Sequence, residues 1–154
     1  MTFIDDYSRK TWIYFLESKE SDEVLDRFQE FRALVENQSE KKIKVFWSDN
    51  GGEYTSGGFG DFCSERGIKR EFTVPYNPQQ NDVAEHKKRT IISEVKAIIH
   101  DQGVLMFPWV EACSTIVYVQ NRCPHRRLRH TTPEEAFSGV KPEIGHLRIF
   151  GCPV

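Results

Sequence analysis

The sequence predicts a single layered α/β domain. Two short runs rich in β-branched and aromatic residues open the chain, and helical and strand spacings of apolar residues then alternate. Helical spacing dominates the second half. The chain has 154 residues, a length that suits one domain with a substantial core. We therefore expect residues 1–154 to form one domain.

The first half predicts a hairpin followed by helices and strands in alternation. The runs Thr2–Asp5 and Thr11–Leu16 flank a polar loop and predict a β-hairpin. Apolar residues at helical spacing predict an amphipathic helix over residues 21–37, with Ser21 or Asp22 as its N-cap. The elements predicted next are a strand at Ile43–Trp47, a short helix from Phe59 to Arg66 stopped by Gly67, and a strand at Ile68–Val74 ended by Pro75.

The second half predicts helices after a polar loop. Apolar spacing, a proline at a helix start and a Thr-Pro pair are the signals. The predicted segments are a helix from about Val83 to Gln102 stopped by Gly103, a helix from Pro108 to about Arg122, and a capped turn at Thr132–Phe137.

Composition excludes several classes of protein. The net charge of −2 gives no overall basic character, so any surface for nucleic acid must be local. The N-terminus lacks a secretory pattern and no apolar run is long enough for a membrane span, which predicts a nuclear or cytoplasmic protein without membrane contact. The cysteines are scattered and predict reduced thiols; they are Cys63, Cys113, Cys123 and Cys152.

Two carboxylates are the candidate catalytic and metal-binding residues. Asp49 ends an apolar strand, and Glu85 opens a helical pattern after a polar loop. Carboxylates that converge from a strand end and a helix start can hold hard divalent cations, and a two-metal site stabilises both oxygens in phosphoryl transfer. Each residue also has a plain structural interpretation. Asn50-Gly51 is a strong hairpin-turn signal, and Glu85 suits the first turn of any helix.

Two basic clusters are candidates for holding a DNA backbone, with an ordinary solvated surface as the alternative. The first follows Glu85 directly and contains Lys87, Lys88 and Arg89, beside His86. The second contains Arg122, Arg126, Arg127 and Arg129, with His125 and His130 among them.

Several motifs in a fixed order resemble the integrase catalytic core of copia-type LTR retrotransposon Pol polyproteins. The matching segments are Phe3–Arg9, Ser48–Tyr54, Pro75–Asn81, Val83–Glu85, Arg89–Thr90, Thr132–Ala136 and His146–Cys152. The resemblance implies an RNase H-like mixed sheet flanked by helices. It also implies a DDE polynucleotidyl transferase that uses Mg²⁺ or Mn²⁺ to trim the element's DNA ends and join them to target DNA. Asp49 matches the family's second metal-binding aspartate and Glu85 its glutamate, and the loop ending at Asn81 is expected to contact DNA.

One departure from the family changes the expected activity. The family's first catalytic aspartate lies on a central strand that precedes the segment matching Thr2–Arg9. Asp5 and Asp6 match the hairpin and are not taken as replacements. We therefore expect a fragment or decayed copy that lacks this strand and is inactive alone. The sheet should then show either a gap, or direct pairing of Thr2–Asp5 with Ile43–Trp47.

Two other functions stay open at this point. One is a catalytically dead module that binds nucleic acid or associates with itself, so a homo-oligomer is among the expected partners. The other is a structure-selective nuclease on the same fold, which would need a different third carboxylate.

Overall fold

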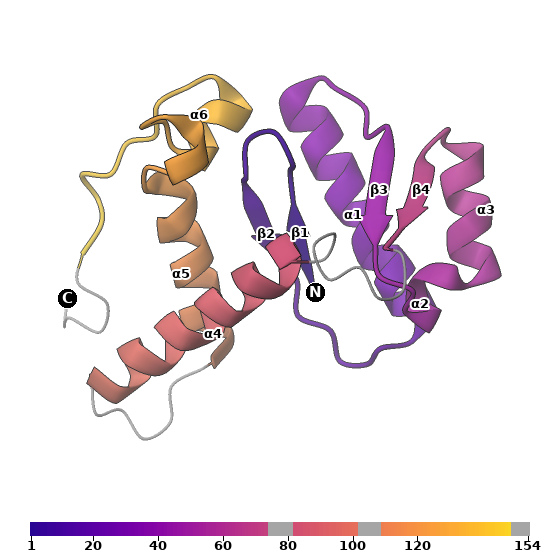
Figure 1. The fold of residues 1–154 in the computed structure, drawn as a ribbon, viewed down its shortest axis with the longest axis horizontal. Helices are drawn as coiled ribbons and strands as arrows, with labels where there is room; N and C mark the ends of the chain where they lie inside the picture. The colour runs from indigo at the N-terminus through magenta and orange to yellow at the C-terminus, as the bar shows by residue number, and fades with distance from the viewer. Residues whose placement is uncertain (74–81, 102–108, 149–154) are drawn as a thin grey trace. The chain divides into compact units, whose positions relative to one another are not determined.

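A computed structural model of the chain describes residues 1–73, 82–101 and 109–148. The chain divides into two compact units, and each is described by itself (Figure 1). The parallel-sheet unit is Tyr14–Val83, and the hairpin unit combines Met1–Ile13 with Ala84–Val154. Among the described residues, no helix is both long and apolar enough to cross a membrane.

The parallel-sheet unit contains two parallel strands and the helices that pack with them. Its elements are α1 (Ser21–Ser39), β3 (Val45–Ser48), α2 (Gly52–Thr55), α3 (Gly57–Glu65) and β4 (Lys69–Phe72). In the parallel register, Val45 lies opposite Lys69 and Ser48 opposite Phe72. Parallel strands need a crossover connection, and here α2 and α3 form it.

Aromatic packing forms the core of this unit. The ring of Phe28 on α1 lies 4.6 Å from that of Phe46 on β3 and 5.1 Å from that of Phe59 on α3, between ring centroids. Phe28 and Phe59 are fully buried. Because side chains alternate along a strand, Val45 and Trp47 point to the other face of β3, where they are 40% and 57% exposed.

The hairpin unit joins the N-terminal hairpin to the helices of the second half. Its elements are β1 (Thr2–Ile4), β2 (Thr11–Ile13), α4 (Asp82–Asp101), α5 (Trp109–Arg122), the 3-10 turn η2 (Arg126–Leu128) and α6 (Pro133–Ser138). The strands are antiparallel, and Phe3 lies opposite Trp12. Ile91 and Val95 of α4 pack with Ile116 of α5 in a buried cluster, against which Ile13 of β2 also packs.

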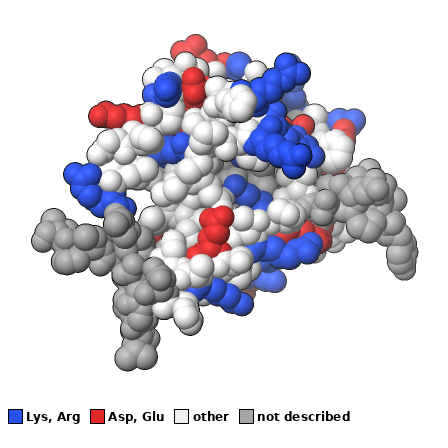
Figure 2. All heavy atoms as spheres, turned by 60° about the vertical axis from the view of Figure 1, so that its left-hand side comes forward, with Lys and Arg blue, Asp and Glu red and all other residues white. Residues whose placement is uncertain are grey.

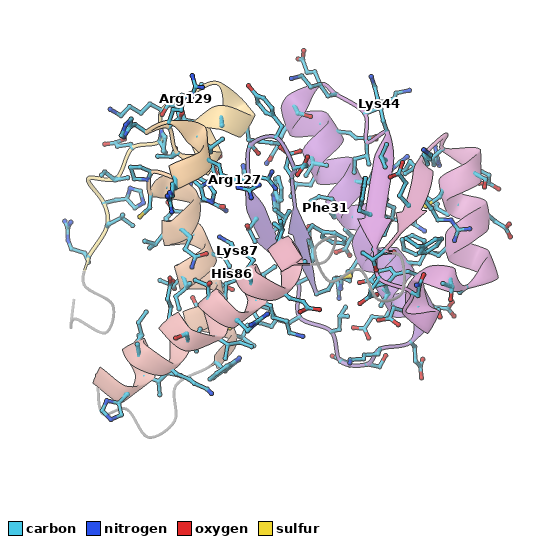
Figure 3. All side chains as sticks on the ribbon, viewed as in Figure 1. Phe31, Lys44, His86, Lys87, Arg127 and Arg129 are labelled. Atoms are coloured by element: carbon cyan, nitrogen blue, oxygen red, sulfur yellow. The ribbon has the colours of Figure 1, made fainter. Side chains whose placement is uncertain are left out.

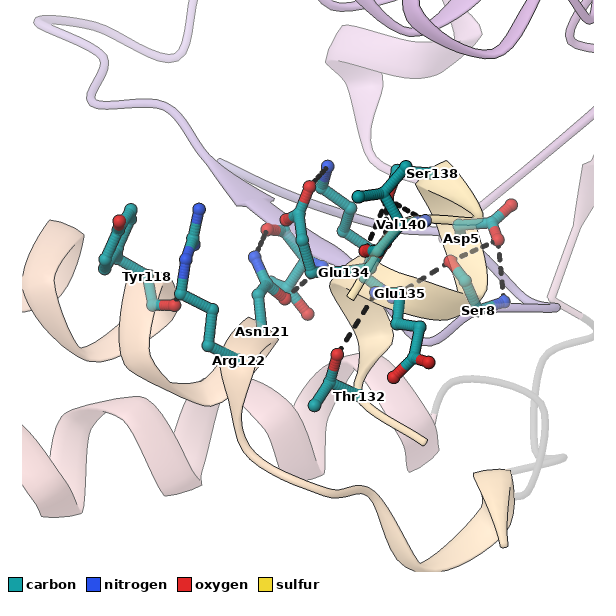
Figure 4. Close-up of polar contacts among 12 residues, drawn as sticks. Asp5, Ser8, Tyr118, Asn121, Arg122, Thr132, Glu134, Glu135, Ser138 and Val140 are labelled. Atoms are coloured by element: carbon teal, nitrogen blue, oxygen red, sulfur yellow. Dashed lines mark hydrogen bonds and ion pairs between the residues drawn. The ribbon is translucent and has the colours of Figure 1, made fainter. Parts of the chain in front are cut away.

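Side chains of α5 and α6 hold the hairpin (Figure 4). The Asn121 side chain receives a hydrogen bond from the Thr11 amide at 2.9 Å and donates one to the Thr11 carbonyl at 2.8 Å. The Lys10 ammonium lies 2.8 Å from the Glu134 carboxylate. In the hairpin loop, the Asp5 carboxylate accepts hydrogen bonds from the Ser8 amide and hydroxyl at 2.8 and 2.6 Å. The contacts of Asn121 and Glu134 fix the start of β2 on the helices.

The predicted elements are confirmed in type and order over the described residues. The second hairpin strand ends at Ile13 rather than Leu16, because the chain leaves the sheet after three residues. The short helix α2 was not predicted, since its four residues are too few for periodicity to appear. Predictions on Pro75–Asn81, Gly103 and Cys152 lie outside the described residues. Cys63, Cys113 and Cys123 are free thiols, as predicted.

Two predictions about local structure were wrong. The N-cap of α1 is Glu20 and makes no side-chain cap bond, so neither Ser21 nor Asp22 caps the helix. The Glu23 carboxylate instead accepts hydrogen bonds from the Glu17 and Ser18 amides, at 2.9 and 2.8 Å. Direct pairing of the first strand with Ile43–Trp47 is also wrong, because the described strands form two sheets, β1 with β2 and β3 with β4.

Candidate active site and nucleic-acid interface

Asp49 lies at the carboxyl edge of the parallel sheet, directly after β3. Its carboxylate Oδ1 accepts a hydrogen bond from the Gly51 amide at 3.1 Å. The neighbouring Asn50 side chain donates to the carbonyl of Thr73, the residue after β4, at 3.0 Å. The loop is therefore tied to both strands at the edge where parallel sheets usually bind ligands.

Gly51 allows two carboxylates to approach the same point of the backbone. A Cβ on Gly51 would lie 2.6 Å from Glu53 Oε2 and 3.1 Å from Asp49 Oδ1. Gly51 has φ −57° and ψ 142°, which any residue adopts, so the missing side chain is what matters here. The hairpin-turn interpretation of Asn50-Gly51 is wrong, because helices and a parallel strand follow.

Tyr54 adds a neutral phenol beside these carboxylates. Burial, followed by the charges of Asp49 and Glu53, raises the pKa of Tyr54 to about 12. Its ring packs in the core, 5.8 Å from the rings of Phe46 and Phe59 between centroids. The phenol therefore stays protonated at neutral pH and adds no negative charge to the loop.

Glu85 lies near the start of α4, with its side chain 60% exposed. Glu85 Oε2 is 3.7 Å from Arg89 Nη2, one helical turn further on. Glu85 belongs to the hairpin unit and Asp49 to the parallel-sheet unit, so their convergence stays a prediction.

The donor chemistry of Asp49 and Glu85 suits a hard divalent cation, because both offer carboxylate oxygens near the surface. Within the described part of the chain, no three potential ligands gather closely enough to hold an ion.

The predicted DNA-contacting residues differ in how free their side chains are. Lys88 and Arg89 are exposed on α4, and Arg126 is exposed in η2. Arg127 and Arg129 are exposed in and beside η2 (Figure 3). The Arg122 guanidinium lies 3.5 Å from the centre of the Tyr118 ring, so it is engaged within α5. Asn81 lies outside the described residues. On the face drawn in Figure 2, basic and acidic side chains are interspersed.

Cations from three segments of the hairpin unit affect one histidine, His125. Burial first, and then the charges of Lys87, Arg9 and Arg127, lower the pKa of His125. Burial also lowers the pKa of Lys87, with the Glu94 charge acting against that shift.

Arg9 is not among the residues that the sequence predicted to contact DNA. Arg9 precedes Lys10 at the end of a hairpin loop, and only its place in the Phe3–Arg9 motif singled it out. Its side chain is 17% exposed and forms an ion pair of 2.8 Å with Asp6, itself almost fully exposed.

Comparison with solved structures defines the class of fold. A chain of the simian T-cell lymphotropic virus intasome, solved in complex with PP2A regulatory subunit B56 gamma, aligns with a TM-score of 0.75 and 17% identity. The alignment covers 99% of this chain and 53% of that one. The HTLV-2 integrase catalytic core domain, solved with magnesium in a trimeric form, aligns with a TM-score of 0.69 over 88% of this chain and 82% of its own. The fold is therefore that of an RNase H-like catalytic core.

Sequence comparison then identifies the family. Residues 1–78 match the integrase core domain family. The chain belongs to this family. It is 44% identical over 152 residues to the Pol polyprotein of transposon TNT 1-94 from Nicotiana tabacum. The alignment covers 99% of this chain and 11% of that polyprotein. It is 34% identical to that of transposon RE2 from Arabidopsis thaliana, over 97% of this chain and 10% of the relative. The chain thus spans about a tenth of the length of these relatives.

Proposed function

We propose that this chain contributes to DNA integration by divalent-metal-dependent phosphoryl transfer, with Asp49 and Glu85 as catalytic carboxylates. The proposal rests on the position of Asp49. Its loop holds an exposed carboxylate at the carboxyl edge of a parallel sheet, in a chain of the integrase core domain family.

The reaction exchanges one phosphodiester bond for another. A DNA hydroxyl attacks a phosphorus of the target strand, the new P–O bond forms as the old one breaks, and the proton leaves with the departing oxygen or with solvent. Bound Mg²⁺ or Mn²⁺ would supply stabilisation of both the attacking and the leaving oxygen. Asp49 and Glu85 would hold the ions, and the Gly51 amide orients the Asp49 carboxylate by its hydrogen bond.

DNA is the proposed partner, both as element ends and as target. Exposed cations on α4 and around η2 support this, since phosphate contacts position a duplex without reading its sequence. Because the overall charge is −2, we expect modest binding that weakens steeply with salt. The solved neighbours include an intasome and a trimeric core, which favours testing self-association as well.

A strand-transfer assay with Mg²⁺ or Mn²⁺ tests the proposal. We expect negligible joining of DNA ends by the 154-residue chain alone, because two carboxylates do not complete the site. The same chain, extended by the segment that precedes the matching region in the Nicotiana tabacum Pol polyprotein, should join ends and lose activity on Asp49→Asn or Glu85→Gln. Wild-type activity in these two variants would overturn the proposal.

The short chain also distinguishes the alternatives. Robust Mn²⁺-dependent joining by the 154 residues alone, lost in Asp49→Asn, would mean that another carboxylate of this chain completes the site. DNA binding without joining in the extended chain would instead favour a catalytically dead binding module. Cleavage of branched DNA without joining would favour a structure-selective nuclease.

A further inference from the structure

We propose that Arg70 is a positioning residue for Asp49 and that it acts through the short helix α2. The inference rests on the proposed function, in which Asp49 is a catalytic carboxylate. It adds a residue of β4 that contacts the backbone behind the Asp49 loop. Arg70 determines where the Asp49 carboxylate lies and takes no part in the reaction itself.

Arg70 reaches the helix that follows the Asp49 loop. Its guanidinium Nη1 donates a hydrogen bond to the backbone carbonyl of Tyr54 at 3.2 Å. Tyr54 lies near the end of α2, a helix of only four residues. The last four carbonyls of a helix have no partner within the helix, and a charged donor makes a stronger hydrogen bond than a neutral one. The guanidinium therefore anchors the end of α2 to β4.

Backbone hydrogen bonds continue from α2 to the carboxylate. The Tyr54 amide donates to the Gly51 carbonyl at 3.0 Å, and the Thr55 amide donates to the same oxygen at 3.2 Å. The Gly51 amide in turn donates to Asp49 Oδ1 at 3.1 Å. Successive hydrogen bonds thus connect the guanidinium of Arg70 to the carboxylate of Asp49. A shift of α2 would move the amide that orients this carboxylate.

Gly60 leaves room for the guanidinium beside α3. A Cβ on Gly60 would lie 2.9 Å from Arg70 Nη2, 3.2 Å from its Cζ and 3.3 Å from its Nη1. Gly60 is buried, so the guanidinium packs directly against the backbone of α3. Arg70 Cζ also lies 5.5 Å from the centre of the Phe72 ring, two residues further along the same face of β4. These contacts fix the guanidinium between β4 and the helices of the crossover.

Two other roles for Arg70 predict different results. A purely structural role would lower the midpoint of thermal unfolding and leave the turnover of the folded enzyme unchanged. A direct contact with DNA would raise the KM for DNA and would depend on the positive charge alone. Positioning of Asp49 instead lowers kcat at an unchanged KM for DNA, and it depends on where the guanidinium lies.

Steady-state strand transfer with Mn²⁺ by the extended chain separates these roles, at a temperature well below the unfolding midpoint. Arg70→Gln removes the cation, whereas Gly60→Ala keeps it and displaces the guanidinium from the Tyr54 carbonyl. Two matched controls lie beside these positions. Lys69→Gln removes a cation of the same strand whose side chain is 71% exposed. Gly58→Ala adds a Cβ to the same helix, and the nearest side chain lies 4.0 Å away.

We expect Arg70→Gln and Gly60→Ala each to lower kcat by roughly 10- to 100-fold, as loss of a group that orients a metal ligand does, without a change in the KM for DNA. Both controls should keep the wild-type kcat. In the 154-residue chain, amide hydrogen exchange over residues 51–55 should become faster in the two test variants and in neither control. If Arg70→Gln does not fold, Gly60→Ala still decides between the roles, because it adds only one methyl group.

Two kinetic results would overturn the inference. One is a wild-type kcat in Gly60→Ala, which would assign any loss in Arg70→Gln to its charge. The other is a raised KM for DNA at a wild-type kcat in Arg70→Gln, which would indicate a direct DNA contact. If the wild-type extended chain joins no DNA ends, the proposed function fails and the exchange measurement decides alone. Faster exchange over residues 51–55 would then support the anchoring of α2 by Arg70, and unchanged exchange would overturn it.

Discussion

At the scale of single residues, the Asp49 loop depends on an absent side chain. Gly51 has backbone angles that alanine tolerates, yet a Cβ there would meet the carboxylates of Glu53 and Asp49. Gly52, the next residue, has no atom within 4 Å of the corresponding position. The two adjacent glycines therefore form a matched pair for mutation.

We predict that Gly51→Ala changes the site more than the stability. The flexible end of Glu53 can turn away, so the midpoint of thermal unfolding should hardly move, while the displaced Asp49 carboxylate lowers strand transfer by the extended chain. Gly52→Ala should keep full activity, and should stabilise by up to about 1 kcal/mol because alanine favours helix. Equal activity in the two variants would contradict the role given to Gly51.

The stability of the chain should depend on the protonation of His125. Burial and three cations lower its pKa in the folded state, so the unfolded state binds more protons as the pH approaches 6.5. Stability is therefore expected to be greatest above this pH and to fall as the pH drops below it. Urea unfolding on both sides of pH 6.5 measures the effect, and His125→Gln should reduce the difference. A pH dependence identical to wild type in this variant would exclude His125 as a contributor.

At the scale of elements, one side chain of α5 acts as a strand partner for β2. Asn121 satisfies both the N–H and the C=O of Thr11, and all of these groups are buried. We predict that Asn121→Ala destabilises the chain by about 2–4 kcal/mol, because two buried backbone groups lose their partners.

The adjacent Gln120 provides the control for this change. Its side chain donates to the Glu94 carboxylate at an exposed position, at 2.6 Å. Gln120→Ala should therefore cost less than about 1 kcal/mol in urea unfolding. Similar losses from the two alanine variants would show that the hairpin does not depend on Asn121.

Helix caps give a second test at this scale. The Thr132 hydroxyl accepts a hydrogen bond from the Glu135 amide at 3.1 Å and caps α6. In α1, the side chain of the N-cap residue Glu20 makes no such hydrogen bond. Thr132→Ala should cost about 1 kcal/mol of unfolding free energy, and Ser21→Ala much less. A larger loss in Ser21→Ala would restore the sequence-based assignment of Ser21 as a cap.

At the scale of the whole molecule, the two sheets are small for the fold class. Each of the described sheets has two strands, and β3 presents Val45 and Trp47 on an exposed face. Two-stranded sheets are marginally stable, and open strand edges favour aggregation.

We therefore predict poor solubility of the 154-residue chain and rapid amide exchange in β1 and β3. Extension by the segment that precedes the matching region in the Nicotiana tabacum Pol polyprotein should slow the exchange of both strands and raise the soluble yield. Hydrogen-exchange mass spectrometry and size-exclusion chromatography measure the two effects. A soluble monomer of the short chain with one cooperative transition and a protected hairpin would show this expectation to be wrong.

The type and order of the elements were open to prediction because their signals are local. Helical periodicity predicted α1, α4 and α5, and the Thr-Pro pair predicted α6. Strand ends and the short helix α2 were less accessible, since sheet pairing and loop contacts set them. Asp49 and Glu85 were singled out by their places at a strand end and a helix start, and by the order of the motifs around them.

By itself, the sequence determined the fold class, the helices, the reduced thiols and the two candidate carboxylates. Only the tertiary structure decided that Asn121 holds the hairpin through both backbone groups of Thr11. It also decided that Gly51 serves two carboxylates rather than a hairpin turn. The physical reason is the same in each case: these contacts depend on backbone approach in three dimensions, whereas sequence patterns report the spacing along one element.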